Sequence, residues 1–374
     1  MEKTTWPHPT IVKWIEDNAI AISADLDAMR RGAEIQKVNA VPALIAFKDG
    51  KELDRTVGYQ TPDQLLPWLE SLKDGKTIDE RLLAEIAALP KNGGEEEVDA
   101  RYDLARRLSR SGHPEEATEQ YIWLWNNIPN MDTGYDGVRV SFMAGDMESV
   151  ALACPPCREK FAALRDALVP RINPGPDFDR EAFNDWVVLN ERVLGDDRAI
   201  ILWGETAEIP PALRDDWRDP FRPARDALIE LKRWDLAARL ISDPAAHARN
   251  CTRMARERNE ITKQTGPEHA TDPEYIATMA RIDRNRLAEL HGLALVLGVD
   301  VDARAIADEA IAFDPSDDMR IALVQAALSA NQVRRMHVEL LESCPTASEH
   351  LRTLITEALT TPASPQTPPP TPAP

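Results

Sequence analysis

The sequence predicts an α/β segment followed by an all-α region. Residues 1–74 combine short β-like apolar runs with amphipathic helices. From Val98 to Thr360, apolar residues recur mainly at helical spacing. A polar stretch rich in Gly and Glu, residues 75–97, separates the two and contains a short predicted helix. A chain of 374 residues is long enough for about two or three domains.

Strands are predicted at two places in the α/β segment. The run "NAIAISADLD" (18–27) is apolar and ends in acids, which indicates a short strand. The run "PALIAFKDGKELDRTVGY" (42–59) contains two β-like segments around Asp49-Gly50. This dipeptide suits a tight turn with positive φ, so the sequence predicts a hairpin there.

A helix is predicted directly after the hairpin, in "TPDQLLPWLESL" (61–72). Thr61 can cap it, Pro62 suits its first position, and Gln64 can complete a capping box. The order of elements is therefore strand, helix, hairpin, helix. The apolar residues of the last helix form a stripe at helical spacing: Leu65, Leu66, Trp68, Leu69 and Leu72.

The stretch "KVNAVPALIAFKDGKELDRTVGYQTPDQLLPWLESL" resembles the C-terminal half of a thioredoxin domain. In that family a Val-Pro pair with a cis peptide bond precedes a strand, a Gly-containing turn follows, and a Gly closes the next strand before a final helix. Val41-Pro42, Asp49-Gly50 and Gly58 occupy those places. With the upstream residues "MEKTTWPHPTIVKWIEDNAIAISADLD", the resemblance covers about residues 1–74. It implies that Val41 and Pro42 bind an extended substrate segment through strand-like hydrogen bonds.

The segment departs from the family at its beginning. Family members carry W-C-x-x-C a few residues before the position of Met1, so the catalytic dithiol and the interior strand leading to it are absent from these 374 residues. Buried backbone groups left unpaired across such a gap cost roughly 1–3 kcal/mol each. Two explanations stay open. The true start codon lies further upstream, or the domain is degenerate and fills the gap in another way.

The all-α region is similar in part to tetratricopeptide repeats. Residues 99–129 predict two helices joined at Gly112-His113-Pro114. Residues 286–316 and 317–345 repeat the scheme, but a period of about 34 residues is not kept between them and the first pair. We therefore expect an irregular helical-repeat region in which the β-like runs "VRVSF" and "AIILW" are few and short.

The predicted domain organisation combines these segments. The final residues, "TTPASPQTPPPTPAP", are too rich in Pro for a helix and predict a disordered tail. The fold class is thus α/β plus all-α, a partial thioredoxin-like fold followed by tetratricopeptide-like helices. The predicted boundaries are 1–74 (thioredoxin-like), 75–97 (linker), 98–172 (helical, with the first hairpin), 173–360 (helical) and 361–374 (tail).

Cys154 and Cys157 form a C-x-x-C pair in "ALACPPCREKF" (151–161). Pro155 and Pro156 suit a helix start, which would place both cysteines near a helix N-terminus that favours a thiolate. A thioredoxin active site, however, needs a preceding strand and a later cis-Pro, and neither is predicted around this pair. We prefer two packed cysteines at a helix junction. A redox or disulfide role and a metal role with distant ligands stay open.

Composition narrows the classes of partner. Lys and Arg number 44 against 63 Asp and Glu, and the net charge of -19 argues against nucleic acid or an anionic membrane as the main partner.

No apolar run of about 18 residues and no secretory signal is visible, and four cysteines fit a reducing compartment. The sequence as written predicts a cytoplasmic protein; a longer N-terminus could carry a signal for secretion or the periplasm. No motif calls for a metal or cofactor.

These observations lead to three function hypotheses. The first is a bacterial-type thioredoxin-like protein, related to thiol-disulfide oxidoreductases and joined to a helical region that binds protein or peptide partners. The second is a non-catalytic peptide-binding or scaffold protein, in which the many tryptophans of the helical region line a groove instead of only packing helices. The third is redox activity of Cys154 and Cys157 themselves.

Overall fold

The computed structural model divides into two compact units, which are described separately. The first comprises residues 1–167 and 192–195, and the second comprises 168–191 and the chain from 196 onward. The residues that the structure describes are 1, 4–25, 30–36, 38, 41–73, 75–76, 80, 84, 87–88, 94–110, 112–131, 134–216, 218–265 and 272–360. The predicted tail and much of the predicted linker lie outside them.

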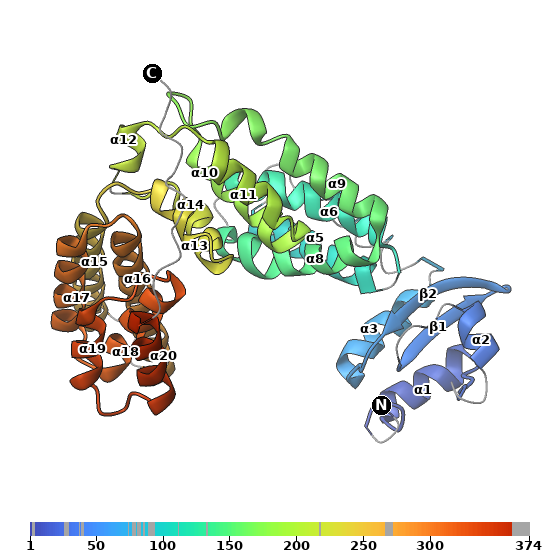
Figure 1. The fold of residues 1–374 in the computed structure, drawn as a ribbon. Helices are drawn as coiled ribbons and strands as arrows, with labels where there is room; N and C mark the ends of the chain where they lie inside the picture. The colour runs from blue at the N-terminus through green and yellow to red at the C-terminus, as the bar shows by residue number, and fades with distance from the viewer. Residues whose placement is uncertain are drawn as a thin grey trace. The chain divides into compact units, whose positions relative to one another are not determined.

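The first unit begins with a small α/β region. Its sheet is an antiparallel hairpin of two strands that starts at the pair Ala43↔Val57. Asp49 and Gly50 have φ values of 53° and 76°, the left-handed conformation that a tight hairpin turn requires. The elements are α1 (Pro9–Asn18), α2 (Arg30–Ile35), β1 (Ala43–Lys48), β2 (Lys51–Val57) and α3 (Pro62–Leu72) (Figure 1).

The core of this region lies between the two longer helices and one face of the hairpin. Thr61 and Gln64 form the expected capping box at the start of α3. Asp54 is buried in β2, and the indole Nε1 of Trp68 donates a hydrogen bond to its carboxylate at 3.0 Å. The buried apolar residues are Ile11, Trp14, Leu65, Trp68 and Leu69, with Leu44 and Ala46 of β1 packed against them.

The strand expected at residues 18–27 does not form among the described residues. Asn18 ends α1, residues 19–25 are neither helix nor strand, and 26–29 lie outside the described chain. Ile20 and Ile22 are 92% and 86% exposed. An isolated strand has no partner for its backbone hydrogen bonds, so an apolar run forms a strand only where a neighbour is present.

The rest of the first unit is mainly helical among its described residues. The hairpin predicted at 99–129 is formed by α5 and α6, whose facing residues Leu104 and Tyr121 are fully buried. The β-like run "VRVSF" is helical instead, because it lies at the end of α7 and in the π-helical turn that continues into α8. The elements are α5 (Glu95–Arg110), α6 (Pro114–Asn127), α7 (Asp136–Val138), η2 (Arg139–Met143), α8 (Ala144–Ala153) and α9 (Pro155–Asp166).

The second unit is all-α among its described residues. The β-like run "AIILW" lies inside α11, whose N-cap Asp196 accepts a hydrogen bond from the backbone of Ala199. The helices are α10 (Arg180–Val188), α11 (Asp197–Thr206), α12 (Pro211–Arg214), α13 (Arg222–Glu230), α14 (Trp234–Arg239), α15 (Pro244–Thr265), α16 (Pro273–Val296), α17 (Asp300–Phe313), α18 (Asp317–Ser329), α19 (Arg335–Glu342) and α20 (Glu349–Thr360) (Figure 1).

One continuous apolar core joins α10, α11 and α13 through α18. Polar groups are buried with it. Arg225 donates two hydrogen bonds of 2.6 Å to the carboxylate of Asp219. His291 and His337, both fully buried, approach to 3.0 Å between their Nε2 atoms.

No helix in the described part of the chain combines the length and the apolar character that crossing a membrane requires.

Candidate functional site

The first candidate site is the loop before β1. The peptide bond between Val41 and Pro42 is cis. The carbonyl oxygen of Pro42 accepts a hydrogen bond from the backbone of Gly58 at 2.8 Å, which fixes the loop to the end of β2. Gly58 has a φ of 99°, a conformation that favours glycine. This hydrogen bond therefore fixes the position of the loop at the start of the hairpin.

Two N-terminal residues hold the segment that follows Gly58. The Thr5 hydroxyl donates to the carbonyl oxygen of Gln60 at 2.6 Å, and the Thr4 and Tyr59 hydroxyls are 2.9 Å apart. Sequence reasoning did not single out Thr4, Thr5 or Tyr59, because these contacts join residues 55 positions apart. These hydrogen bonds tie the N-terminus to the segment that follows β2.

Part of the surface of this loop is exposed. Val41 is 63% exposed and Tyr59 is 54% exposed. The β1–β2 ladder begins at Ala43, so Val41 stands outside it. The four cysteines of the sequence all follow residue 150, so residues 1–74 supply no thiol to this loop. An exposed backbone beside a strand can pair with an extended peptide, and the apolar side chains can contact it.

The second candidate site is the Cys154–Cys157 pair, which is joined in a disulfide. Cys154 ends α8 and is the N-cap of α9, where its Sγ accepts a hydrogen bond from the Cys157 backbone at 3.2 Å. The sequence favoured unbonded cysteines at this junction. The helix start instead brings their Cα atoms to 5.2 Å, which lies within the range that a disulfide spans.

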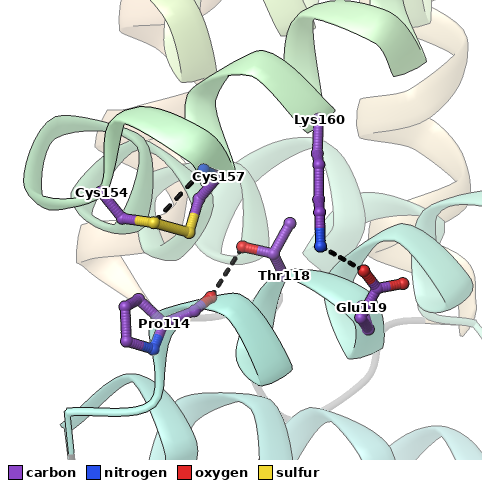
Figure 2. The surroundings of a disulfide bond; sticks show 6 residues. All are labelled: Pro114, Thr118, Glu119, Cys154, Cys157 and Lys160. Carbon is purple, nitrogen blue, oxygen red and sulfur yellow. Dashed lines mark hydrogen bonds and ion pairs between the residues drawn. A yellow bond between two sulfur atoms is a disulfide. The ribbon is translucent and has the colours of Figure 1, made fainter.

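The disulfide is covered. Cys154 is 6% exposed and Cys157 is fully buried, while Pro155 and Pro156 between them are exposed. Figure 2 shows the bond with Pro114 and Thr118 of α6 around it; the Thr118 hydroxyl donates to the Pro114 carbonyl oxygen at 2.8 Å. A thiolate that attacks this bond must first reach sulfur atoms that the fold almost hides.

Val41 and Pro42 lie in one loop, and Cys154 and Cys157 form one disulfide, but these two features are not bonded to each other. Among the described residues, no hydrogen bond or ion pair connects the Val41-Pro42 loop to Cys154 or Cys157. The cis-Pro loop therefore lacks a dithiol in the part of the chain that the structure describes.

A metal role finds no ligand set within the described chain, where no group of three His, Cys, Asp or Glu side chains is arranged to hold an ion. Cys251 lies in α15, where burial raises the pKa of its thiol. Cys344 is buried as a free thiol near the carbonyl oxygen of Asp317, with its Sγ at 3.8 Å.

Comparisons with known proteins support a thioredoxin-like region. The chain is 42% identical over 60 residues to a thioredoxin of Chlamydia trachomatis serovar D, a match that covers 16% of this chain and 49% of that protein. It is 47% identical over 45 residues to a thioredoxin of Chlamydia muridarum, covering 12% and 44%. The chain thus spans about half the length of the curated relatives it matches. No protein-family model and no solved structure matches it.

Proposed function

We propose that this chain is a peptide- or protein-binding relative of the thiol-disulfide oxidoreductases. Its thioredoxin-like region contacts an extended segment of the partner through Val41 and Pro42, and the helical region adds further contacts. The observation that carries this proposal is the position of Val41, which is 63% exposed, directly before β1 and outside the β1–β2 ladder. An exposed backbone beside a strand can pair with an extended peptide.

The test compares one substitution at two exposed valines. Val41→Asp places a charge in the proposed peptide contact, whereas Val301→Asp changes a 79% exposed valine of α17. The probe is the reduced and alkylated insulin B chain, an extended peptide that cannot exchange disulfides. Isothermal titration should show that Val41→Asp weakens binding about tenfold or more, which corresponds to about 1.4 kcal/mol. Binding should be unchanged in Val301→Asp.

Equal affinities for both variants and the unsubstituted chain would contradict the proposal. Circular dichroism of each variant separates a lost contact from a lost fold, since both valines are exposed and neither belongs to a core.

A second candidate function rests on the disulfide at the start of α9. A substrate thiolate would attack one sulfur and release the other as a thiolate; a second substrate thiol would then resolve the mixed disulfide. The substrate dithiol is oxidised and the Cys154–Cys157 bond is reduced. The N-terminal end of α9 favours the released thiolate, and the near-complete burial of the pair opposes its attack.

Insulin reduction with dithiothreitol tests this candidate. Dithiothreitol is the dithiol that is oxidised as the Cys154–Cys157 bond is reduced, and the reduced pair then re-forms its disulfide by reducing a disulfide of insulin. Redox activity of the pair predicts that Cys154→Ser lowers turnover to the uncatalysed rate, with Cys251→Ser as the matched control. Equal turnover by Cys154→Ser and the unsubstituted chain rules the candidate out.

A further inference from the structure

The second unit contains a pocket of about 850 Å³ whose lining includes the ends of α11, α12 and α14. Its described lining residues all belong to this unit. Most of them are apolar, among them Leu240 and Ile241, which are each 2% exposed, and the partly buried Ile209. Small-molecule sites have volumes of roughly 300–1,000 Å³ and apolar walls with a few polar groups. The pocket therefore has the size and the walls of a ligand site.

Arg239, the last residue of α14, brings one edge of its guanidinium to this pocket. Its Nη1 donates to the carbonyl oxygens of Gly204 and Glu205, at 3.0 and 3.1 Å. These bonds fix the side chain and offset the negative end of the α11 dipole, which would otherwise repel an anion. The Nε and Nη2 groups make no hydrogen bond within the described chain. Together they form the edge of a guanidinium that binds both oxygens of a carboxylate.

Arg214, the last residue of α12, lines the same pocket. The residue after it, Asp215, accepts a hydrogen bond from the Ser242 hydroxyl, which ties the end of α12 to the segment that follows α14. The Nε of Arg214 is buried without a partner in the described chain. Buried polar groups normally have a hydrogen-bond partner, so the Arg214 guanidinium is an unsatisfied feature of the pocket wall.

The pocket carries an excess of positive charge. Glu208 is the acidic residue among its described lining residues, and neither arginine forms an ion pair with it or with another described carboxylate. The whole sequence has 63 acidic and 44 basic residues, so a shortage of carboxylates does not explain the two unpaired arginines. An anionic ligand supplies the missing partner.

We propose that this pocket binds a small organic acid. The carboxylate of the ligand lies between Arg214 and Arg239, and its hydrocarbon body lies against Leu240 and Ile241. An acid with an apolar body matches both the arginines and the apolar walls, whereas an inorganic anion leaves the walls uncovered. Binding here does not depend on peptide binding by Val41 and Pro42.

Isothermal titration of the full chain with phenylbutyrate tests the ligand class. Phenylbutanol has a similar hydrocarbon body without the charge, and acetate has the carboxylate without the body. We expect phenylbutyrate to bind, and both partial probes to bind at least about tenfold more weakly. No binding of phenylbutyrate, or equal affinity for either partial probe, overturns the proposal.

Two variants test the position of the carboxylate. Arg239→Lys keeps a charge but removes the two-donor edge, and Arg214→Gln removes the second charge. Each should weaken phenylbutyrate binding about fivefold or more, while phenylbutanol binding stays the same. The matched control is Arg249→Gln, which changes an exposed arginine of α15 that does not line the pocket. Circular dichroism verifies the fold of each variant. Unchanged phenylbutyrate affinity in either pocket variant contradicts the proposal.

Discussion

The α/β region and the helical second unit differ in how completely they cover their apolar residues and backbone. The α/β region has a small core between α1, α3 and one face of a two-stranded hairpin, and it leaves Ile20, Ile22 and the free edge of β1 exposed. The second unit joins most of its helices in one core and buries charged and titratable side chains with partners.

The difference follows from where each element finds its hydrogen bonds. A helix satisfies its backbone within itself, so helices remain intact whichever neighbour they pack against. A strand depends on an adjacent strand for its backbone hydrogen bonds, and the largely apolar residues 19–25, which pair with no strand of the described chain, are neither helix nor strand. The second unit should therefore be intolerant of internal changes, and the α/β region tolerant.

The largest expected effect is at the buried ion pair of the second unit. Burial alone would raise the pKa of the Asp219 carboxyl, but the hydrogen bonds and charge of Arg225 outweigh it and lower that pKa. Asp219→Ala leaves the buried Arg225 guanidinium unpaired and should lower the free energy of unfolding by about 3–5 kcal/mol. The matched change in the α/β region is Glu52→Ala, which removes the more exposed ion pair with Arg55 and should cost about 1 kcal/mol or less.

Urea unfolding followed by circular dichroism measures both variants. The comparison between the two regions fails if Glu52→Ala costs as much as Asp219→Ala.

Acidification should produce the next largest effect, through the buried histidine pair. The Nδ1–H of His291 donates a hydrogen bond to the carbonyl oxygen of Ala303 at 2.9 Å. The Nε2 of His291 is therefore unprotonated and accepts a hydrogen bond from the Nε2–H of His337. The unprotonated Nδ1 of His337 in turn accepts a hydrogen bond from the backbone N–H of Arg334 at 2.8 Å. This arrangement uses two neutral rings. Burial lowers the pKa of His291 to about 3, with the charge of His337 a second cause, and lowers the pKa of His337 to about 4, against an ordinary value of 6.5.

The sign follows from proton uptake on unfolding. Below pH 6.5 the unfolded chain binds two protons that the folded pair excludes, so stability is present above that pH and is lost as the pH falls toward 4. Each histidine contributes about 1.4 kcal/mol per pH unit in this window. Glu289, whose pKa burial raises to about 7, contributes a slope of opposite sign. A histidine variant and the unsubstituted chain both contain Glu289, so the difference between their pH slopes reports the histidine alone.

We therefore expect His337→Gln to reduce the slope of unfolding free energy against pH by about 1.4 kcal/mol per unit. His8→Gln, which removes a histidine of the α/β region, is the matched control. An identical pH profile for His337→Gln and the unsubstituted chain would show that the pair does not set the acid sensitivity.

The smallest expected effect is at a helical glycine. A Cβ at Gly292 in α16 would lie 2.6 Å from Cζ3 of Trp234, so Gly292→Ala forces the indole or the helix to move and should cost about 1–3 kcal/mol. Gly145 in α8 of the first unit has no atom within 4 Å of the same position, and Gly145→Ala should stabilise by up to about 1 kcal/mol. Thermal unfolding of both variants gives the two signs, and the same sign for both would refute the close-packing argument.

Features set by neighbouring residues could be predicted from the sequence. The capping box of Thr61 and Gln64 and the turn at Asp49-Gly50 depend on groups within four residues. The helical hairpin at 99–129 followed from apolar spacing on two adjacent helices. The prediction of a strand at 18–27 was wrong, because an apolar pattern does not indicate whether a neighbouring strand is present. The candidate site could be predicted from the sequence only in part. Val41 and Pro42 were found by resemblance, whereas the hydrogen bonds of Thr4 and Thr5 were not found.

The sequence by itself determined where the helix after the hairpin begins and where the hairpin turns, since these depend on local hydrogen bonds and on side-chain periodicity. The thioredoxin-like segment was found by its resemblance to that family. Only the tertiary structure decided that Cys154 and Cys157 are bonded and covered, that His291 meets His337 across 46 residues, and that Ile20 and Ile22 have no partner in the described chain. Contacts between distant residues depend on how elements pack, and packing is set by the combined burial of many side chains instead of by any one local pattern.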